Sequence, residues 1–185
     1  MALKRFPLEQ YASLELNQVA FPKTGMVISQ TPLGAEFTEA APCENGMWVL
    51  ADKSKGTIGS AAAVTDTPIG IVYTSEKEYD NAHYGLKTFG RKIAGDYPRV
   101  GILGLGDTVT TNCLKYNDTE FATVEALYAA LEAFATTAVY VKLNANDPVP
   151  QLTATKPSSG IYGKVTKFYT VPNGERGVKY EIVNL

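Results

Sequence analysis

The hydrophobic pattern divides the chain into an irregular N-terminal stretch, a long series of short β-like runs and one helical segment. Within residues 1–40, large apolar residues follow neither a sustained helical period nor a long alternation, and Pro22, Gly25 and Pro32 interrupt them. We therefore expect an extended arm over residues 1–40. A large apolar side chain left in water forfeits about 1.5–3 kcal/mol. The arm is thus expected to lie on its own domain or on a neighbouring molecule.

From residue 41 onward, short apolar runs rich in β-branched residues alternate with turn-forming segments at intervals of about ten residues, which is typical of small barrels and sandwiches. The runs are 46–51, 57–61, 69–74, 99–103, 107–111, 138–143, 161–171 and 177–183. Residues 75–98 are polar with scattered aromatic residues, and we interpret them as a loop insertion. The sequence predicts a mainly β (α+β) domain over residues 41–185, either a small barrel of β-tulip type or a sandwich.

One segment has clear helical periodicity. Its apolar residues recur on one face at Val124, Leu127, Tyr128, Leu131, Phe134 and Ala135. Thr123 is placed to cap the N-terminus, and Glu125 lies in the first turn, where a negative charge is favourable. These positions predict one amphipathic helix over about 124–135.

The composition narrows the function classes. Seventeen Lys and Arg against nineteen Asp and Glu give a net charge of −2, whereas nucleic-acid binding normally shows a basic excess, so we expect no nucleic-acid partner. No run of 18 apolar residues is present, and polar residues follow the N-terminal Lys4 and Arg5 before a signal core can form. We expect no membrane partner and synthesis in the cytoplasm.

The residues that most often support catalysis or metal binding are scarce. The chain has one histidine, His83, and two cysteines, Cys43 and Cys113, which lack metal-ligand spacing and are expected to be small buried hydrophobic residues. Residues 85–92 have the glycine spacing of a phosphate loop but lack its Lys and Ser/Thr, and residues 101–106 have their glycines in the wrong order for a dinucleotide turn. We expect no catalytic residues, no metal and no cofactor.

Carboxylates and aromatic residues leave other possibilities open. A hydrolase can work with two carboxylates, and six acidic residues could meet in three dimensions: Glu36, Glu39, Glu44, Glu76, Glu78 and Asp80. We assign Trp48 and Tyr73, which lie on predicted strands, to the core. The aromatic residues of the insertion remain candidates for a sugar-binding or partner-binding surface, because tyrosine recurs at interfaces.

Several segments together resemble the head decoration, or cement, proteins of tailed bacteriophages. They are the glycine-led strand 44–50, the polar turn 53–58, the Pro-Ile-Gly strand 67–72, and the later strand pair 99–103 with Gly106-Asp107. The resemblance covers about half of the chain and lies in the order and spacing of these segments. The predicted helix and the insertion at 75–98 are departures from the smallest members of that family.

The resemblance implies a non-enzymatic structural protein on the outside of a virion. Its partners would be the major capsid protein, whose neighbouring subunits it would clamp, and copies of itself, a trimer being favoured. The predicted contact residues come from the arm and from the insertion: Phe6, Tyr11, Leu14, Phe21, Tyr79, Tyr84 and Tyr97.

Two other functions are compatible with the same sequence. A phage tail or baseplate component would also be β-rich and nearly neutral. A carbohydrate-binding module would use the aromatic loop 75–98, and substitution of Tyr84 or Tyr97 would abolish glycan binding.

Overall fold

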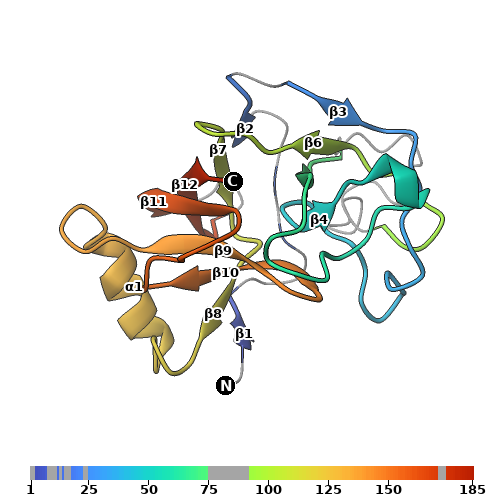
Figure 1. The fold of residues 1–185 in the computed structure, drawn as a ribbon. Helices are drawn as coiled ribbons and strands as arrows, with labels where there is room; N and C mark the ends of the chain where they lie inside the picture. Colours follow the sequence, from blue (N-terminus) through green and yellow to red (C-terminus); the bar gives the residue numbers. More distant parts are fainter. Residues whose placement is uncertain are drawn as a thin grey trace.

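The computed structural model describes residues 3–7, 12, 14, 18–22, 25–74, 92–170 and 174–185. In these residues it contains two β-sheets and one α-helix (Figure 1). The strands of the first half are β1 (Leu3–Arg5), β2 (Val19–Ala20), β3 (Val27–Ile28), β4 (Trp48–Leu50), β5 (Ile69–Val72) and β6 (Val100–Ile102). Those of the second half are β7 (Thr108–Thr111), β8 (Lys115–Asn117), β9 (Tyr140–Asn144), β10 (Asp147–Thr153), β11 (Tyr162–Thr170) and β12 (Arg176–Asn184).

The larger sheet has eight strands in the order β1-β8-β10-β9-β11-β12-β7-β2. Its longest strands, and the longest of the described chain, are the antiparallel pair β11–β12. The mainly β class with one helix is confirmed. Within the described residues the eight strands form an open sheet. In this part of the chain the sheet does not close into a barrel, because the end strands β1 and β2 are not paired with each other.

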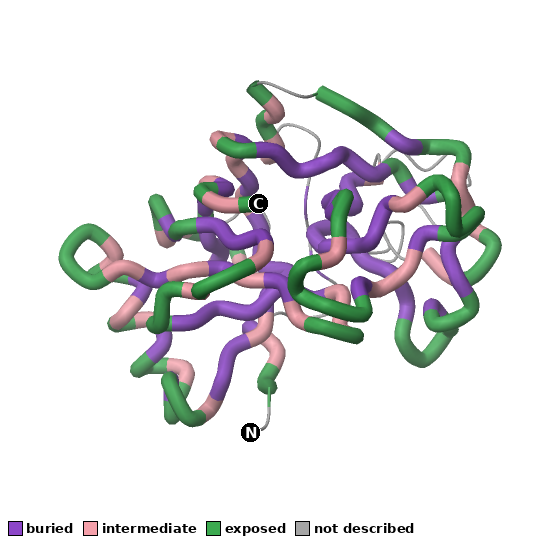
Figure 2. Tube along the Cα trace, in the orientation of Figure 1, coloured by how far each residue is buried: buried purple, intermediate pink, exposed green. Residues whose placement is uncertain are grey.

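The smaller sheet has four antiparallel strands in the order β3-β6-β5-β4. Every residue of β4, β5 and β6 is buried, so both faces of this sheet are covered (Figure 2). Successive side chains along these strands therefore point into two different hydrophobic cores. Trp48, Leu50 and Ile71 point to one core, whereas Val49, Val72 and Val100 point to the other.

The first of these, the central core, lies between the two sheets and also receives helix residues Leu127 and Leu131. Its largest side chains, Trp48 and Tyr180, are fully buried, and the Trp48 indole N–H donates to the Tyr180 hydroxyl at 2.9 Å. This bond ties β4 of the small sheet to β12 of the large one. A buried tryptophan is well accommodated only where its N–H has such a partner.

The second, the lateral core, lies on the other face of the small sheet. Irregular segments cover it there, and their apolar anchors are Leu33, Phe37, Cys43 and Ile58. Both cysteines are free and buried in this core, as expected from the sequence.

The described parts of residues 1–40 contribute edge strands to both sheets. β1 and β2 form the two edges of the large sheet, and β3 forms one edge of the small sheet. The Phe21 ring lies over Gly101 of β6, where an added Cβ would come within 2.3 Å of Phe21 Cζ. The N-terminal stretch thus lies against its own domain at these points.

The helix α1 spans Val124–Glu132 and begins as expected, because the Thr123 side chain accepts from the Ala126 N–H at 3.2 Å. It ends three residues earlier than predicted. The amide groups of Thr136 and Thr137 both donate to the Ala133 carbonyl, which closes the last turn, while Phe134 still packs against the central core.

Candidate functional site

Two segments beside the small sheet are joined by backbone hydrogen bonds and form what we call the loop platform, residues 33–43 and 92–97. Leu33 exchanges bonds with Asp96 (2.9 Å) and Gly95 (3.1 Å). Farther along, the Ala94 N–H donates to Phe37 O at 2.8 Å, and Cys43 and Lys92 exchange bonds of 2.7 and 2.8 Å. These bonds make one unit of two segments that are far apart in sequence.

The local sequence explains the shape of the platform. The Asp96 carboxylate accepts from the Ile93 N–H at 2.9 Å, and Gly95 adopts a φ of +88°, which glycine tolerates best, so the chain turns back over three residues. Leu33 and Phe37 anchor the opposite segment in the lateral core. Tyr97 follows this turn and is 61% exposed, so the platform presents an aromatic side chain to solvent.

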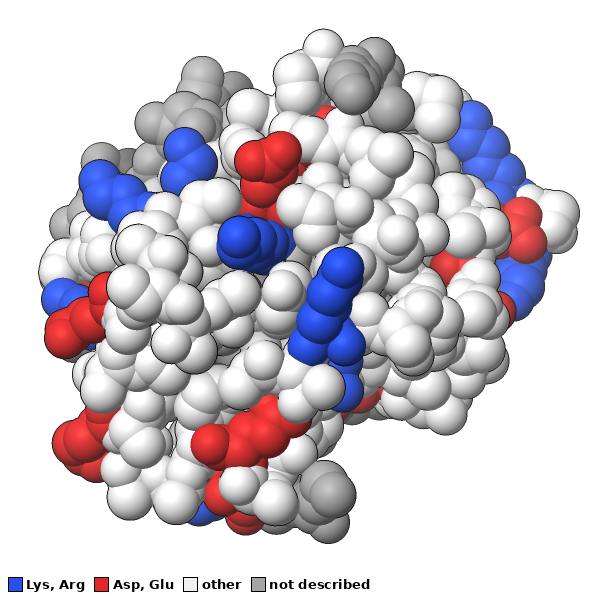
Figure 3. All heavy atoms as spheres, turned by 60° about the vertical axis from the view of Figure 1, so that its left-hand side comes forward, with Lys and Arg blue, Asp and Glu red and all other residues white. Residues whose placement is uncertain are grey.

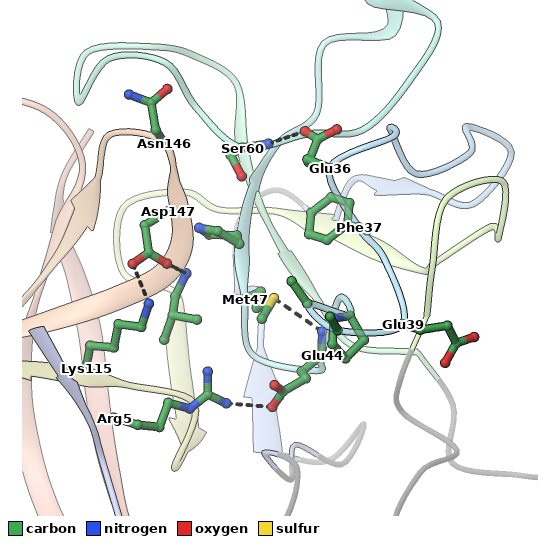
Figure 4. Close-up of a pocket in the computed structure, with 15 residues that line it drawn as sticks. Arg5, Glu36, Phe37, Glu39, Glu44, Met47, Ser60, Lys115, Asn146 and Asp147 are labelled. Carbon is green, nitrogen blue, oxygen red and sulfur yellow. Dashed lines mark hydrogen bonds and ion pairs between the residues drawn. The ribbon is translucent and has the colours of Figure 1, made fainter.

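A pocket of about 520 Å³ opens between the platform, β1 and the start of β10 (Figure 4). Its charged lining residues are Arg5, Glu36, Glu39, Glu44, Lys115 and Asp147. Three of the six carboxylates considered from the sequence, Glu36, Glu39 and Glu44, therefore line one pocket.

The contacts of these charged groups hold the structure together. Glu44 Oε2 binds Arg5 Nη2 at 2.6 Å and also accepts from the Ala12 N–H at 2.8 Å. Asp147 binds Lys115 Nζ at 2.5 Å and accepts from the Val149 N–H at 3.1 Å. Glu36 accepts from the Ser60 N–H at 3.1 Å. Because each of these carboxylates is bound by backbone amides or cations of its own chain, we interpret the pocket as a structural joint.

The pKa values near this joint agree with that interpretation. Burial raises the pKa of the Cys113 thiol to about 12, and burial also raises the pKa of Cys43. Both thiols are therefore protonated at neutral pH and are poor nucleophiles. Burial lowers the pKa of Arg5, but the Cys113 thiolate, which forms only at alkaline pH, and the carboxylates of Glu44 and Asp147 more than offset this and raise it overall. Arg5 remains a cation.

The predicted contact residues have different environments. Phe6 and Leu14 are fully buried in the central core of their own chain, which is one of the two placements expected for the arm. Phe21 is partly buried and meets Tyr73 edge to face, with ring centroids 5.5 Å apart. Tyr97 is exposed on the loop platform. Tyr11, Tyr79 and Tyr84, like His83, lie outside the described residues. Trp48 and Tyr73 belong to the core, as predicted.

One exposed feature was missed in the sequence. Met26 and Val27, at the free edge of the small sheet, are 57% and 37% exposed and border an apolar pocket of about 430 Å³. The signal is present as Met26-Val27-Ile28 directly after Gly25. Three apolar residues among prolines and glycines are too few to show a period, so the pattern predicts no element here.

The charges on the face shown in Figure 3 are mixed. Basic and acidic side chains alternate there, and uncharged side chains cover most of the area between them. Among the described residues, no group of three or more His, Cys, Asp or Glu is arranged to hold a metal ion. Within the same residues, no helix is long and apolar enough to cross a membrane.

Comparison with known proteins yields no match to a family model, to a curated protein or to a solved structure.

Proposed function

We propose that this chain is a virion structural protein of the capsid-decoration type, which binds the outer surface of an assembled capsid and stabilises it by clamping neighbouring major-capsid subunits. One observation carries the proposal. The segments that resemble decoration proteins are spread over residues 44–107, yet they fold side by side as β4, β5 and β6 with their connecting turns. A resemblance of scattered segments has more weight when those segments form one structural unit.

The loop platform is the part of this unit best suited to contact a partner. Its ladder of backbone bonds fixes the loop that carries Tyr97, so little conformational entropy is lost when the tyrosine ring is buried against another protein. Tyrosine offers a large contact area with few rotatable bonds, which explains its frequency at interfaces. We therefore assign Tyr97 as the principal capsid-contact residue among the described candidates.

The mechanism is mass action. A protein that binds only the assembled shell stabilises that shell in proportion to its binding free energy. Many copies, each bound weakly, then act together against internal pressure. This role requires no reacting group, and the carboxylates of the charged pocket that are bound within their own chain support it.

The test is to mix the purified protein with empty capsids of the source virus and to image the particles by electron cryo-microscopy. We expect saturable, stoichiometric density on the capsid exterior. Tyr97→Ala should weaken binding by at least tenfold, because loss of an aromatic side chain that acts as an interface hot spot costs about 2 kcal/mol or more. The matched control is Tyr140→Ala, a partly exposed tyrosine of β9 in the large sheet, which should bind normally.

The proposal makes two further demands on the particles. The protein must be present in purified virions, and virions stripped of it must lose thermal or osmotic resistance. Absence from the particle, or unchanged survival of stripped particles, contradicts the function. Density at the tail or baseplate would instead identify a tail component. Normal capsid binding by Tyr97→Ala contradicts the assignment of the contact residue.

A further inference from the structure

We propose that the free edge of β3 is a two-fold contact through which two copies of this chain pair, so that their four-stranded sheets join into one continuous sheet. This inference goes beyond the proposed function, because it concerns contact between copies and can be tested without any capsid. Three observations support it: the backbone groups at the edge of β3, the exposed apolar side chains beside that edge, and the fact that a two-fold axis matches both to a second copy.

The backbone N–H and C=O of Val27 are not used in the pairing of β3 with β6. β3 pairs antiparallel with β6, Val27 opposite Gly101 and Ile28 opposite Val100, and the Ile102 N–H donates to Met26 O at 2.9 Å. In an antiparallel ladder, hydrogen-bonded and non-hydrogen-bonded pairs alternate. Val27 is therefore in a non-hydrogen-bonded pair, and its N–H and C=O point away from β6. No described hydrogen bond uses either group. An edge of this kind is a template for another strand.

The side chains beside this edge are apolar and exposed. Met26 projects next to a pocket of about 430 Å³, whose apolar walls are Ile28, Ala51, Pro68 and Ile102. Figures 1 and 2 show β3 on the outside of the molecule, exposed except at Ile28. The patch therefore combines a protruding, flexible methionine side chain with an apolar pocket of its own.

A protruding side chain beside a pocket makes a self-complementary patch, because a two-fold rotation places the side chain of each copy opposite the pocket of the other. If the axis passes beside Val27, perpendicular to the sheet, then the Val27 N–H of each copy donates to the Val27 C=O of the other. Met26 of one copy then lies opposite Ile28 of the other, on the same face and beside its pocket. An isologous contact requires one patch to carry both complementary features, and this patch carries them.

The charges at the rim fit the same symmetry. Asp52 and Lys53 both line the pocket and carry opposite charges. A two-fold axis brings one residue of each sign from each copy to the shared rim, so the rim is neutral. An apolar edge with a neutral rim favours a second copy over a strongly charged partner.

The contact is small, because β3 has only two residues. Small contacts are weak in solution, but a lattice that holds many copies at fixed positions raises their effective concentration. Two-fold pairing is also compatible with the trimer that the resemblance implies. Each trimer would offer three such edges to its neighbours.

The test is sedimentation velocity of the full chain over a range that reaches the order of 100 µM, where a weak contact of this size is populated. The wild-type chain should form, at the highest concentrations, a species of twice the mass of its smallest unit, one chain being 19.9 kDa. Val27→Pro removes only the outward N–H and leaves the bonds to β6 in place, since proline is tolerated at edge positions. It should shift the doubling to at least tenfold higher concentration.

Two further variants complete the test. Met26→Asp, which replaces the protruding apolar side chain with a charged one, should also abolish doubling. Leu105→Asp is the matched control, because Leu105 is 45% exposed but lies in the turn before β7. It should leave doubling unchanged. Circular dichroism must show that all three variants are folded.

The outcomes separate the occupants of the edge. A wild-type chain that never doubles, or variants that double normally, overturn the two-fold contact. If Val27→Pro does not change the mass but abolishes capsid binding, the edge accepts a strand of capsid protein, and pairing of copies is wrong. Conversely, a chain that pairs normally but does not bind capsids overturns only the proposed function.

Discussion

The two sheets are stabilised in different ways. The large sheet contains β11 and β12, nine residues each, which exchange a long ladder of backbone bonds, and β12 buries the side chains of Val178, Tyr180 and Ile182. In the small sheet, β4 and β6 have three residues and β5 has four, with every residue buried. Short strands make few ladder bonds, so the small sheet depends on side-chain packing against both of its faces. Substitutions at its two faces should therefore be the most damaging in the molecule.

The largest effect is expected where the two sheets meet. Trp48→Ala should lower the free energy of unfolding by about 3–5 kcal/mol, because it leaves a large cavity in the central core and removes the bond to Tyr180. Chemical denaturation measures this loss. Tyr180→Phe is the control, since it removes only the hydroxyl and should cost about 1–3 kcal/mol for the indole N–H left without a partner. Equal losses in both variants would mean that packing at Trp48 matters less than its hydrogen bond.

A smaller effect is expected where the N-terminal stretch packs on the small sheet. Gly101→Ala would place a Cβ 2.3 Å from Phe21 Cζ and 3.0 Å from Tyr73 Cε1, so the Phe21 ring must move. We expect a loss of about 1–3 kcal/mol, the usual cost of overpacking. The double variant Gly101→Ala with Phe21→Leu should recover part of the loss. If Gly101→Ala alone is neutral, Phe21 is not fixed against β6.

Alkaline pH distinguishes groups in the two cores. Burial raises the pKa of Tyr180 in the central core and raises that of Cys113 in the lateral core to about 12, from a usual value of 9.0 for the thiol. The folded chain therefore keeps protons that the unfolded chain releases, and the free energy of unfolding must fall as the pH rises. For Cys113 the fall begins near pH 9 and ends near pH 12.

Each such group contributes a slope of about 1.4 kcal/mol per pH unit within its range. Urea unfolding at pH 7 and at pH 10 measures the combined slope. Cys113→Ala should reduce the fall between these pH values, whereas Tyr180→Phe should act mainly above pH 10. A fall that is the same in Cys113→Ala and in the wild type would show that this thiol does not contribute.

The smallest effect is expected for an ion pair within the large sheet. Lys115 and Asp147 join β8 to β10, and both side chains are partly exposed. Lys115→Met should change the free energy of unfolding by no more than about 1 kcal/mol. Asp147→Ala should cost more, because it also removes the acceptor of the Val149 N–H. Equal costs would assign the whole effect to the ion pair.

The sequence predicted elements best where one local pattern dominates. The period of Val124 to Leu131 and the cap at Thr123 mark the helix in the local sequence, and packing of Leu127 and Leu131 in the central core stabilises it. The runs around β11 and β12 are also recognisable, because both are rich in β-forming residues and Val178, Tyr180 and Ile182 of β12 alternate with more exposed positions. In contrast, the edge strands β1, β2 and β3 are two or three residues long and form only because a partner strand is in place.

The candidate site was predictable only in part. Tyr97 was recognised as an aromatic residue in a polar loop, and it is exposed. Its supporting bonds to residues 33–43 could not be read from the sequence, because they join backbone groups of segments that have no shared pattern. Phe6 and Leu14 have the same apolar character as a contact residue, and only burial in the central core separates them from one.

By itself, the sequence determined the β-rich class, the helix that begins after Thr123 and the burial of both cysteines. These follow from local periodicity and from the cost of exposing apolar groups. The tertiary structure alone decided that the small sheet has two covered faces, that the N-terminal stretch supplies edges to both sheets, and that the Val27 N–H and C=O point away from β6. Those features depend on which distant segments pair, and the pairing is set by the total packing of the chain, which no local window contains.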